Sequence, residues 1–484
     1  MDCEISSSKS NSQILSNENL KIKIKGNIPM KEPPDINIKI KLNVEQKKFL
    51  LKNLKESMSN ITVTNNEKNH NAEHNTPFDL IYEIINHLPS SFWISYPKII
   101  DHSCGKGNIV LTIFDEYYSN LIDLHKDPVN LCKKIIEELI YFADINENNI
   151  EYTKNILKKH SKLYTGKDIN FHFNYYLGDS RKINPQTHFN ISKFDAVFVN
   201  PPFEDRLKRN KTQHKLWIEF TKLTFKNLLK ENGYLLQISP SSFSSPSCKI
   251  LTLFREKKVE HLYLNREKYF KNIGTSICWY IIQNTNNTTY TTMVNNRYPV
   301  NFNNQLLYLP NDLCEESLNI HKKVMFNTQN KLKVEKDYVT CHNIILKKPN
   351  PTLSKTETSK HIYPVFHTNK QIWYSSIKQD FADKPKVLWT RSGYTKPQYD
   401  DGKFGVTDLS YFVLVDNKEA GEILNHNINL KLFKYILKTA KWSGFGNDKV
   451  FYALPVLPEK KVLDSELYDY FNLSNEERVY IENY

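Results

Sequence analysis

Four consecutive residues, Asn200-Pro201-Pro202-Phe203, follow the apolar run FDAVFV and carry the most specific chemical pattern in the sequence. The two prolines fix φ and remove two N–H donors, so the loop presents acceptors: the side-chain oxygen of Asn200 and the carbonyl oxygen of Pro201. An amino group on a planar ring could donate to both oxygens while the ring stacks on Phe203. The pattern predicts a site for an aromatic amine; the alternative is an ordinary rigid turn.

A second pattern, IIDHSCGKGN, places an acidic residue at the end of another apolar run and small residues directly after it. The carboxylate of Asp101 can hold polar groups of a ligand, and Gly105 and Gly107 allow the backbone to approach a ligand closely. Since glycines are also common in turns, a plain turn is the alternative. We expect the loop, including Cys104, to bind a ligand.

Two further acidic residues end later apolar runs. Asp144 follows ELIYFA, where a carboxylate can accept hydrogen bonds from both hydroxyls of a ribose. Asp179 follows Gly178, where a carboxylate can accept from the exocyclic amine of a purine. The alternatives are a helix cap for Asp144 and a turn for Asp179.

The order of apolar segments predicts the elements that position these residues. Helical spacing of apolar residues begins after Thr76-Pro77 and recurs at 148–160 and 215–231. Between the helical segments lie apolar runs of strand length, at 96–100, 138–143, 171–177, 194–199, 233–239, 260–264 and 276–282. Strands that alternate with helices predict an open, mostly parallel α/β sheet, whose ligands bind at the carboxyl ends of the strands.

Composition changes along the chain and suggests five parts. We expect a disordered N-terminal tail at 1–45, a short helix and linker at 46–75, an α/β domain at 76–290, a less regular α+β domain at 300–458 and an acidic tail at 459–484. A polar segment, NTNNTTYTTMVNNR, marks the boundary between the two folded domains.

The net charge of +13 favours a polyanionic partner, although a lysine-rich solvated surface would give the same balance. No apolar run approaches the ~18 residues of a membrane span, and the chain does not start with a secretory signal. The 7 cysteines are scattered without a CxxC pair, which supports neither a disulfide framework nor a metal site. We therefore expect a soluble intracellular protein with no membrane partner.

Taken in order, these motifs resemble those of S-adenosylmethionine-dependent amino-methyltransferases, and most closely the N6-adenine DNA methyltransferases of restriction-modification systems with the gamma motif order. The resemblance implies that Asn200–Phe203 is the catalytic motif and that the loop from Asp101 to Gly107 binds the methionine part of the cofactor. It assigns Asp144 to the ribose and Asp179 to the adenine amine. One departure is His102, which stands where the family usually has proline.

Two further segments extend the resemblance. Thr76-Pro77 resembles the segment that closes over the cofactor. Residues 268–282 resemble a later motif, whose aromatic residue, here Phe270, helps to hold a flipped-out base.

The resemblance implies a Rossmann-like methyltransferase sheet with helices on both faces, followed by a C-terminal α+β target-recognition domain. It implies a site-specific DNA methyltransferase that uses S-adenosyl-L-methionine, transfers its methyl group to the N6 amine of an adenine and flips that base out of double-stranded DNA. We expect a monomer or weak dimer. The alternatives are an RNA (guanine or adenine amino) or protein-glutamine methyltransferase with an NPPF loop, and a catalytically silent DNA-binding protein on the same fold.

Basic and aromatic residues on two later segments and one loop are expected to contact DNA. The first segment, DRLKRNKTQHK, directly follows the NPPF loop, and the second is 386–403. The alternative interpretation is a solvated helix start or flexible loop. For the loop at 438–458 the alternative is a turn that packs its aromatic residues on the core. The expected DNA-binding residues are Arg206, Lys208, Arg209, Lys211, Lys215, Arg391, Lys396 and Trp442.

Overall fold

A computed structural model describes residues 53, 55, 56, 58, 75–203, 215–264, 277–286, 290–302, 306–337, 341–391, 396–442 and 446–484. The tail expected at 1–45 and most of the expected linker lie outside these residues. Contacts group Val44–Tyr484 into one compact unit, to which all of the following refers. Of the short helix expected before residue 60, the four described residues, including Met58, are helical.

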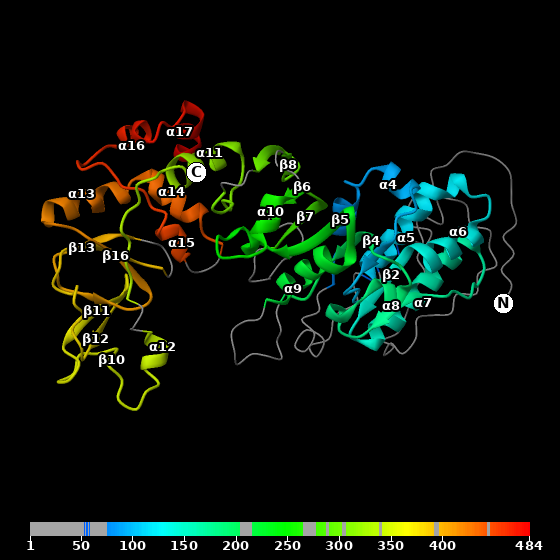
Figure 1. Ribbon diagram of the computed structural model, residues 1–484, viewed down its shortest axis with the longest axis horizontal. Helices are drawn as coiled ribbons and strands as arrows, with labels where there is room; N and C mark the ends of the chain where they lie inside the picture. The colour runs from blue at the N-terminus through cyan, green and yellow to red at the C-terminus, as the bar shows by residue number, and fades with distance from the viewer. Residues whose placement is uncertain are drawn as a thin grey trace, which may run out of the picture. The chain divides into compact units, whose positions relative to one another are not determined.

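A nine-stranded sheet forms the centre of the first part of this unit (Figure 1). The strands are β1 (Ile99–Asp101), β2 (Ile140–Asp144), β3 (Asn174–Leu177), β4 (Phe194–Val199), β5 (Leu229–Pro240), β6 (Lys257–Tyr263), β7 (Ile277–Asn286), β8 (Tyr290–Val294) and β9 (Tyr298–Phe302). Their order is β3-β2-β1-β4-β5-β7-β6-β8-β9. The first five strands pair in parallel and β7 is antiparallel to β5, which confirms the expected α/β sheet.

Alternating side chains of each buried strand enter two different hydrophobic clusters, because successive residues of a strand face opposite sides of the sheet. On β7, Trp279 and Ile281 belong to one cluster, and Tyr280 and Ile282 belong to the other. The helices of this part are α3 (Phe78–Ile85), α4 (Ser90–Ile94), α5 (Asn108–Leu121), α6 (Pro128–Lys134), α7 (Glu147–Thr165), α8 (Pro185–Phe189), α9 (Leu216–Leu223) and α10 (Leu251–Glu256).

Helices cover both faces of the sheet, as expected. Helices α3, α5 and α7 contribute to the first cluster, whereas α9 and α10 contribute to the second through residues such as Trp217 and Phe254. Both faces of the central strands are therefore buried, which explains why β2 and β4 are almost uniformly apolar in sequence.

The strand order changes direction between β1 and β4, because β2 and β3 lie on one side of β1 and β4 and β5 lie on the other. The register places Asp101 opposite Phe142 and Asp144 opposite Leu177. The acidic ends of β1 and β2 and the start of the NPPF loop therefore lie along one edge of the sheet. This is the position at which open α/β sheets bind ligands.

Beyond residue 308 the chain builds a third hydrophobic cluster and two smaller sheets, in the orders β10-β12-β11-β15 and β14-β13-β16. The strands are β10 (Leu353–Ser354), β11 (Tyr363–Thr368), β12 (Gln371–Ser375), β13 (Lys386–Thr390), β14 (Gln398–Asp400), β15 (Gly405–Val406) and β16 (Ser410–Leu414). The helices are α11 (Glu315–His321), α12 (His342–Ile345), α13 (Lys418–Ile428), α14 (Lys431–Thr439), α15 (Asp448–Phe451), α16 (Asp464–Tyr470) and α17 (Asn475–Glu482). This mixture is the expected α+β region.

Two expected boundaries differ from the structure. The main sheet continues through β8 and β9 to Phe302, past the boundary placed at 290, because the polar segment there forms a hairpin. The expected acidic tail, 459–484, is folded: α16 and α17 bury apolar residues such as Leu467 and Ile481 in the third cluster and leave most of their acidic residues at the surface.

Among the described residues, no helix combines the length and the apolar character that a membrane span requires.

Candidate active site

The NPPF loop begins where β4 ends, as expected. Pro201 is buried, while Asn200, Pro202 and Phe203 are half-buried. Phe203 packs against both hydrophobic clusters of the main sheet, which anchors the loop at the sheet edge. The prolines end the strand because they cannot donate to a neighbouring strand.

The side chain of Asn200 is held by a residue that precedes the whole sheet. Its Nδ2 donates to Oγ1 of Thr76 at 3.1 Å, and the carbonyl oxygen of Thr76 accepts from Nδ2 of Asn108 at 2.8 Å. Asn200 Oδ1 accepts no hydrogen bond from the described residues. The amide is therefore oriented with its donor end occupied and its acceptor end open. The sequence analysis assigned Thr76-Pro77 to the site but did not predict a role for Asn108.

Asp101 lies at the end of β1 with only 1% of its surface exposed. Its Oδ1 accepts from the backbone N–H of Ser103 at 3.0 Å, and its buried Oδ2 has no hydrogen-bond partner. Burial, with a smaller contribution from the carboxylate of Asp144, raises the pKa of Asp101 to about 8. Because buried polar groups are nearly always partnered, the free oxygen marks Asp101 as a candidate position for a polar ligand group.

The glycines of the loop after β1 are required by its backbone. Gly105 and Gly107 have φ of 51° and 79°, in the left-handed region that favours glycine. A Cβ atom at Gly107 would lie 2.8 Å from Oγ1 of Thr153. The side chain of Cys104 is buried and lies 3.7 Å from the same hydroxyl, so it packs inside the loop.

Asp144 fixes the same loop from the end of β2. Its Oδ2 accepts from the backbone N–H of Gly105 at 2.9 Å, and its Oδ1 accepts from the N–H of Asn146 at 2.8 Å. Burial raises the pKa of this carboxyl. The side chain of Asn149 also bonds this carboxyl, so Asp144 is held by three neighbouring groups at the end of β2.

Two apolar side chains beside Asp144 were not singled out from the sequence. Ile145 is 66% exposed, and Leu177, opposite Asp144 in the sheet, is 43% exposed. Exposed apolar residues next to a polar strand end offer a surface on which a flat ring can lie. The sequence feature that could have indicated this surface is Ile145, an apolar residue directly after Asp144.

Asp179 follows β3 and caps a short helical turn, η3 (Ser180–Lys182). The guanidinium of Arg181 donates to both carboxylate oxygens, from Nε at 2.9 Å and from Nη2 at 2.8 Å, and Nη1 donates to Glu219 on α9 at 2.9 Å. These bonds hold the pKa of Asp179 below its ordinary value. The carboxylate is therefore ionised and fixed in direction, although Arg181 was not predicted.

His102 has a structural role. Its ring is fully buried and stacks on Phe220 with centroids 5.1 Å apart, and its carbonyl oxygen accepts from the hydroxyl of Ser180 at 2.5 Å. Burial lowers the pKa of His102 to about 4, so the ring is neutral at pH 7.

The residues that were expected to bind DNA differ in their exposure to solvent. Lys215 and Lys396 are exposed, and Arg391 is half-buried with Nη1 3.7 Å from Asp448. Trp442 is only 8% exposed, its indole N–H donates to the carbonyl of Leu309 at 2.9 Å, and its ring packs in the third cluster. This burial contradicts the prediction that Trp442 faces DNA. Outside the described residues lie Arg206, Lys208, Arg209, Lys211 and Phe270.

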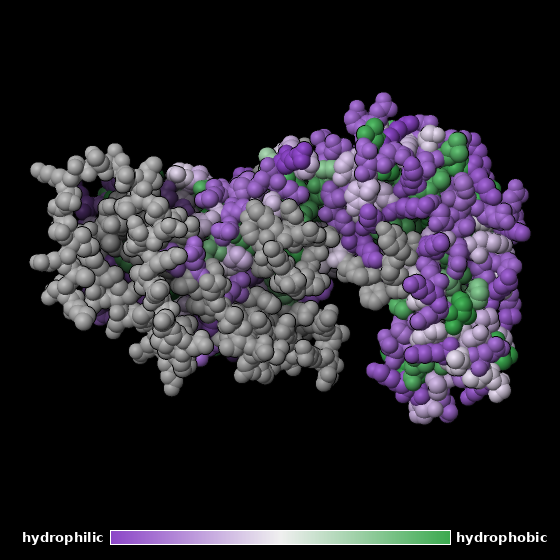
Figure 2. All heavy atoms as spheres, turned by 180° about the vertical axis from the view of Figure 1, so that it is seen from behind, coloured by the Kyte–Doolittle hydropathy of each residue, from purple (hydrophilic) through white to green (hydrophobic). Residues whose placement is uncertain are grey.

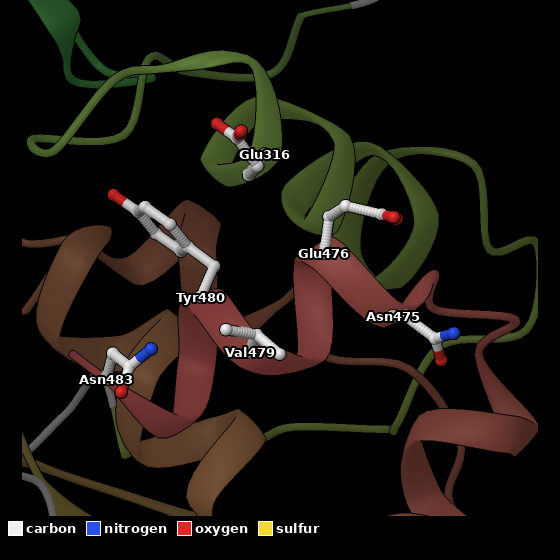
Figure 3. Close-up of a pocket in the computed structure, with 6 residues that line it drawn as sticks. All are labelled: Glu316, Asn475, Glu476, Val479, Tyr480 and Asn483. Carbon is white, nitrogen blue, oxygen red and sulfur yellow. The ribbon is translucent and has the colours of Figure 1, made fainter.

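A shallow pocket elsewhere in the chain lies between α11 and α17 (Figure 3). It is lined by Glu316, Asn475, Glu476, Val479, Tyr480 and Asn483. None of the strand-end residues contributes to it. In the parts of the chain that the structure covers, no group of three or more histidine, cysteine or acidic side chains is placed to hold a metal ion.

Residues 89–273 match the family described as Eco57I restriction-modification methylase. This range contains the loops that follow β1, β2, β3 and β4. No curated protein matches the chain.

Several solved structures are similar at low identity. The M protein of the type I restriction enzyme EcoKI is 14% identical, with a TM-score of 0.35, over 52% of this chain and 53% of that protein. The type IIL restriction-modification enzyme MmeI, solved in complex with DNA, is 11% identical with a TM-score of 0.46, over 81% and 69% of the two chains. This chain thus spans about half the length of the EcoKI subunit.

Replacing Asp101 by Asn tests the electrostatics of the site. The unfolded carboxyl titrates near 3.8 and the folded one near 8, so the folded state retains a proton that the unfolded state has lost. This group therefore contributes stability at low pH that is lost as the pH rises from about 4 to about 8. We expect Asp101→Asn to lose less stability than the wild type between pH 5 and pH 8, measured by urea unfolding.

The matched control is Asp168→Asn, whose carboxylate is 84% exposed. It should follow the wild-type pH dependence. If Asp101→Asn also follows it, the carboxyl of Asp101 is not desolvated as the structure indicates.

Proposed function

We propose that this chain, whose residues 89–273 form a restriction-modification methylase domain of the Eco57I family, is a site-specific DNA methyltransferase. It transfers a methyl group from S-adenosyl-L-methionine to the N6 amino group of an adenine flipped out of double-stranded DNA. The observation that carries this proposal is the Asn200 amide, whose donor end is occupied by Thr76 and whose acceptor end is open at the edge of the sheet. An acceptor held in this way suits an amine, which can only donate through its N–H groups.

The strand-end residues fit the proposed cofactor. The unpartnered oxygen of Asp101 suits the ammonium group of its methionine part, whose charge would favour the ionised carboxylate. Gly107 lets the loop pack closely on Thr153, where a Cβ atom would lie 2.8 Å from Oγ1. Asp144 suits the ribose hydroxyls, and Asp179 suits the purine amine. Ile145 and Leu177 offer an apolar surface to the purine ring. When bound, the cofactor supplies an electrophilic methyl group.

The residues of the NPPF loop would then act on the target base. Asn200 Oδ1 and the Pro201 carbonyl oxygen accept hydrogen bonds from the N6 amine, whose lone pair is otherwise delocalised into the ring. These bonds draw the nitrogen toward tetrahedral geometry and stabilise the positive charge that develops on it. Phe203 stacks on the base and replaces part of the stacking lost on flipping, about 1–3 kcal/mol per base. We propose that Phe270 also helps to hold the flipped-out base.

Charge and surface character support a nucleic-acid partner. The chain carries a net charge of +13, and the surface over the C-terminal strands and helices is largely hydrophilic (Figure 2). The exposed lysines there include Lys347, Lys348, Lys360 and Lys370. Lysines of this kind contribute to binding through phosphate contacts.

The rival functions share parts of this site. An RNA or protein-glutamine methyltransferase would use the same acceptors for its amine, and the long α+β region after residue 308 favours duplex DNA over these substrates. A silent DNA-binding protein would have no need of the oriented amide or of the buried, unpartnered carboxylate oxygen of Asp101.

Substituting Asn200 tests the proposed chemistry. Asn200→Ala should lose at least 100-fold in methyl transfer to duplex DNA, because it removes an acceptor that stabilises the developing charge. Cofactor affinity should stay within about twofold, because the substitution keeps the backbone carbonyl that Ser103 contacts and the lost side chain bonds only Thr76 among the proposed cofactor residues. Transfer is measured with methyl-labelled cofactor, and affinity by titration.

The control is Asn284→Ala, which removes a half-buried amide that donates to the carbonyl of Lys230 in the same sheet. It should retain wild-type transfer. Transfer at the wild-type rate in Asn200→Ala would mean that the catalytic assignment is wrong.

The salt dependence of DNA binding tests the basic segment after the NPPF loop. Replacing Lys208 and Arg209 together by Ala should make the plot of log K against log[salt] shallower by about two units, because each lost phosphate contact removes about one released counterion. The double variant Lys460→Ala, Lys461→Ala is the control, since these lysines pair with Glu466 and Glu422. Equal slopes for the first variant and the wild type would remove this segment from the interface.

A further inference from the structure

The hydroxyl group of Thr76 faces the catalytic amide. Thr76 is buried, and the printed sequence separates it from Asn200 by 124 positions, yet its Oγ1 accepts from Asn200 Nδ2 at 3.1 Å. The resemblance assigns this segment to closing over the cofactor, which would leave the hydroxyl free for the cofactor itself. The observed contact gives the hydroxyl a different partner.

Thr76 is itself fixed from two sides. Its carbonyl oxygen accepts from Nδ2 of Asn108, the first residue of α5 directly after the glycine loop, at 2.8 Å. On its other side, Pro77 caps α3, and the N–H of Ile81 donates to the Pro77 carbonyl oxygen at 3.1 Å. Helix α3 buries five apolar residues, so Thr76 sits on a rigid support.

The orientation of an asparagine side chain depends on such a partner. The oxygen and nitrogen of the amide are nearly equal in size, and a rotation of about 180° exchanges the acceptor for a donor. In the rotated state the NH₂ group of Asn200 would meet the N–H of the target amine, and two donors cannot bond. In the observed orientation, the bond from Nδ2 to Oγ1 of Thr76 leaves Oδ1 as the end that the loop presents. Because a hydroxyl can bond either end of an amide, Thr76 holds the side chain in place, and an amine, which can only donate, selects the orientation with Oδ1 toward it.

We propose that Thr76 is a positioning residue for catalysis: its hydroxyl holds the Asn200 amide with Oδ1 toward the target amine, and Asn108 holds Thr76. This inference rests on the proposed function. It gives the segment before α3 a role in the chemical step. It also links the loop that binds the cofactor to the loop that binds the base through one residue.

Thr76→Val, which is nearly isosteric and lacks the hydroxyl, tests the proposal. We expect kcat to fall 10-fold to 100-fold, with cofactor Kd within about twofold, because misplacement of a reacting group costs rate rather than affinity. Thr76→Ser keeps the hydroxyl and should restore kcat to within about threefold of the wild type. The control is Thr112→Val, which removes a buried hydroxyl bonded to the backbone carbonyl of Asn108 and leaves Asn200 untouched.

A weakened cofactor Kd with unchanged kcat in Thr76→Val would overturn the proposal, because the hydroxyl would then hold the cofactor. A second readout does not depend on activity. In protein labelled with ¹⁵N-asparagine, the side-chain amide of Asn200, assigned by its loss in Asn200→Ala, should exchange its protons faster in Thr76→Val than in the wild type. Unchanged exchange would also overturn the proposal. Failure of the wild type to methylate any substrate would contradict the proposed function alone.

Discussion

The site depends on the parallel pairing of β1 with β2 on one side and β4 on the other. This pairing brings Asp101, Asp144 and the NPPF loop to one edge of the sheet, although their positions in the chain lie far apart. Helices cover both faces of the central strands, so the strand ends at this edge are where polar side chains can meet a ligand. The chemistry proposed for the chain needs this edge because it must hold a cofactor and an amine in line.

The carboxyl groups at this edge differ in how many hydrogen-bond partners the protein gives them. Asp144 is bonded to the backbone of the glycine loop, and Asp179 is held by Arg181, so both are fixed before any ligand arrives. Asp101 keeps a buried oxygen without a partner, and burial raises its pKa. The Asp101 carboxyl is therefore the polar group at this edge that the fold leaves without a full set of partners.

The sequence predicted correctly the features that a residue type determines through its own local backbone or position. Acidic residues that close apolar runs, glycines in a left-handed turn and paired prolines after a strand predicted the fold and most strand-end residues. It was uninformative where the result depends on distant partners. The bond between Thr76 and Asn200 joins residues 124 positions apart, and Trp442 was misassigned because an aromatic residue in a glycine-containing loop suits both a core and an interface. The prediction of an acidic tail at 459–484 was wrong because acidic residues dominate the composition of this segment. Its apolar residues form one face of α16 and α17, which is buried only because α14 and α11 pack against it.

The central claim, transfer of a methyl group to adenine N6 in duplex DNA, is tested most directly by identifying the product. The protein is incubated with methyl-labelled S-adenosyl-L-methionine and unmodified duplex DNA, RNA or release factor in parallel, and labelled nucleic acid is digested to nucleosides. We predict label in the DNA alone, in N6-methyldeoxyadenosine. The claim would be contradicted by label in a methylated cytosine, in RNA or in protein. The absence of label in DNA of varied sequence would also contradict the claim.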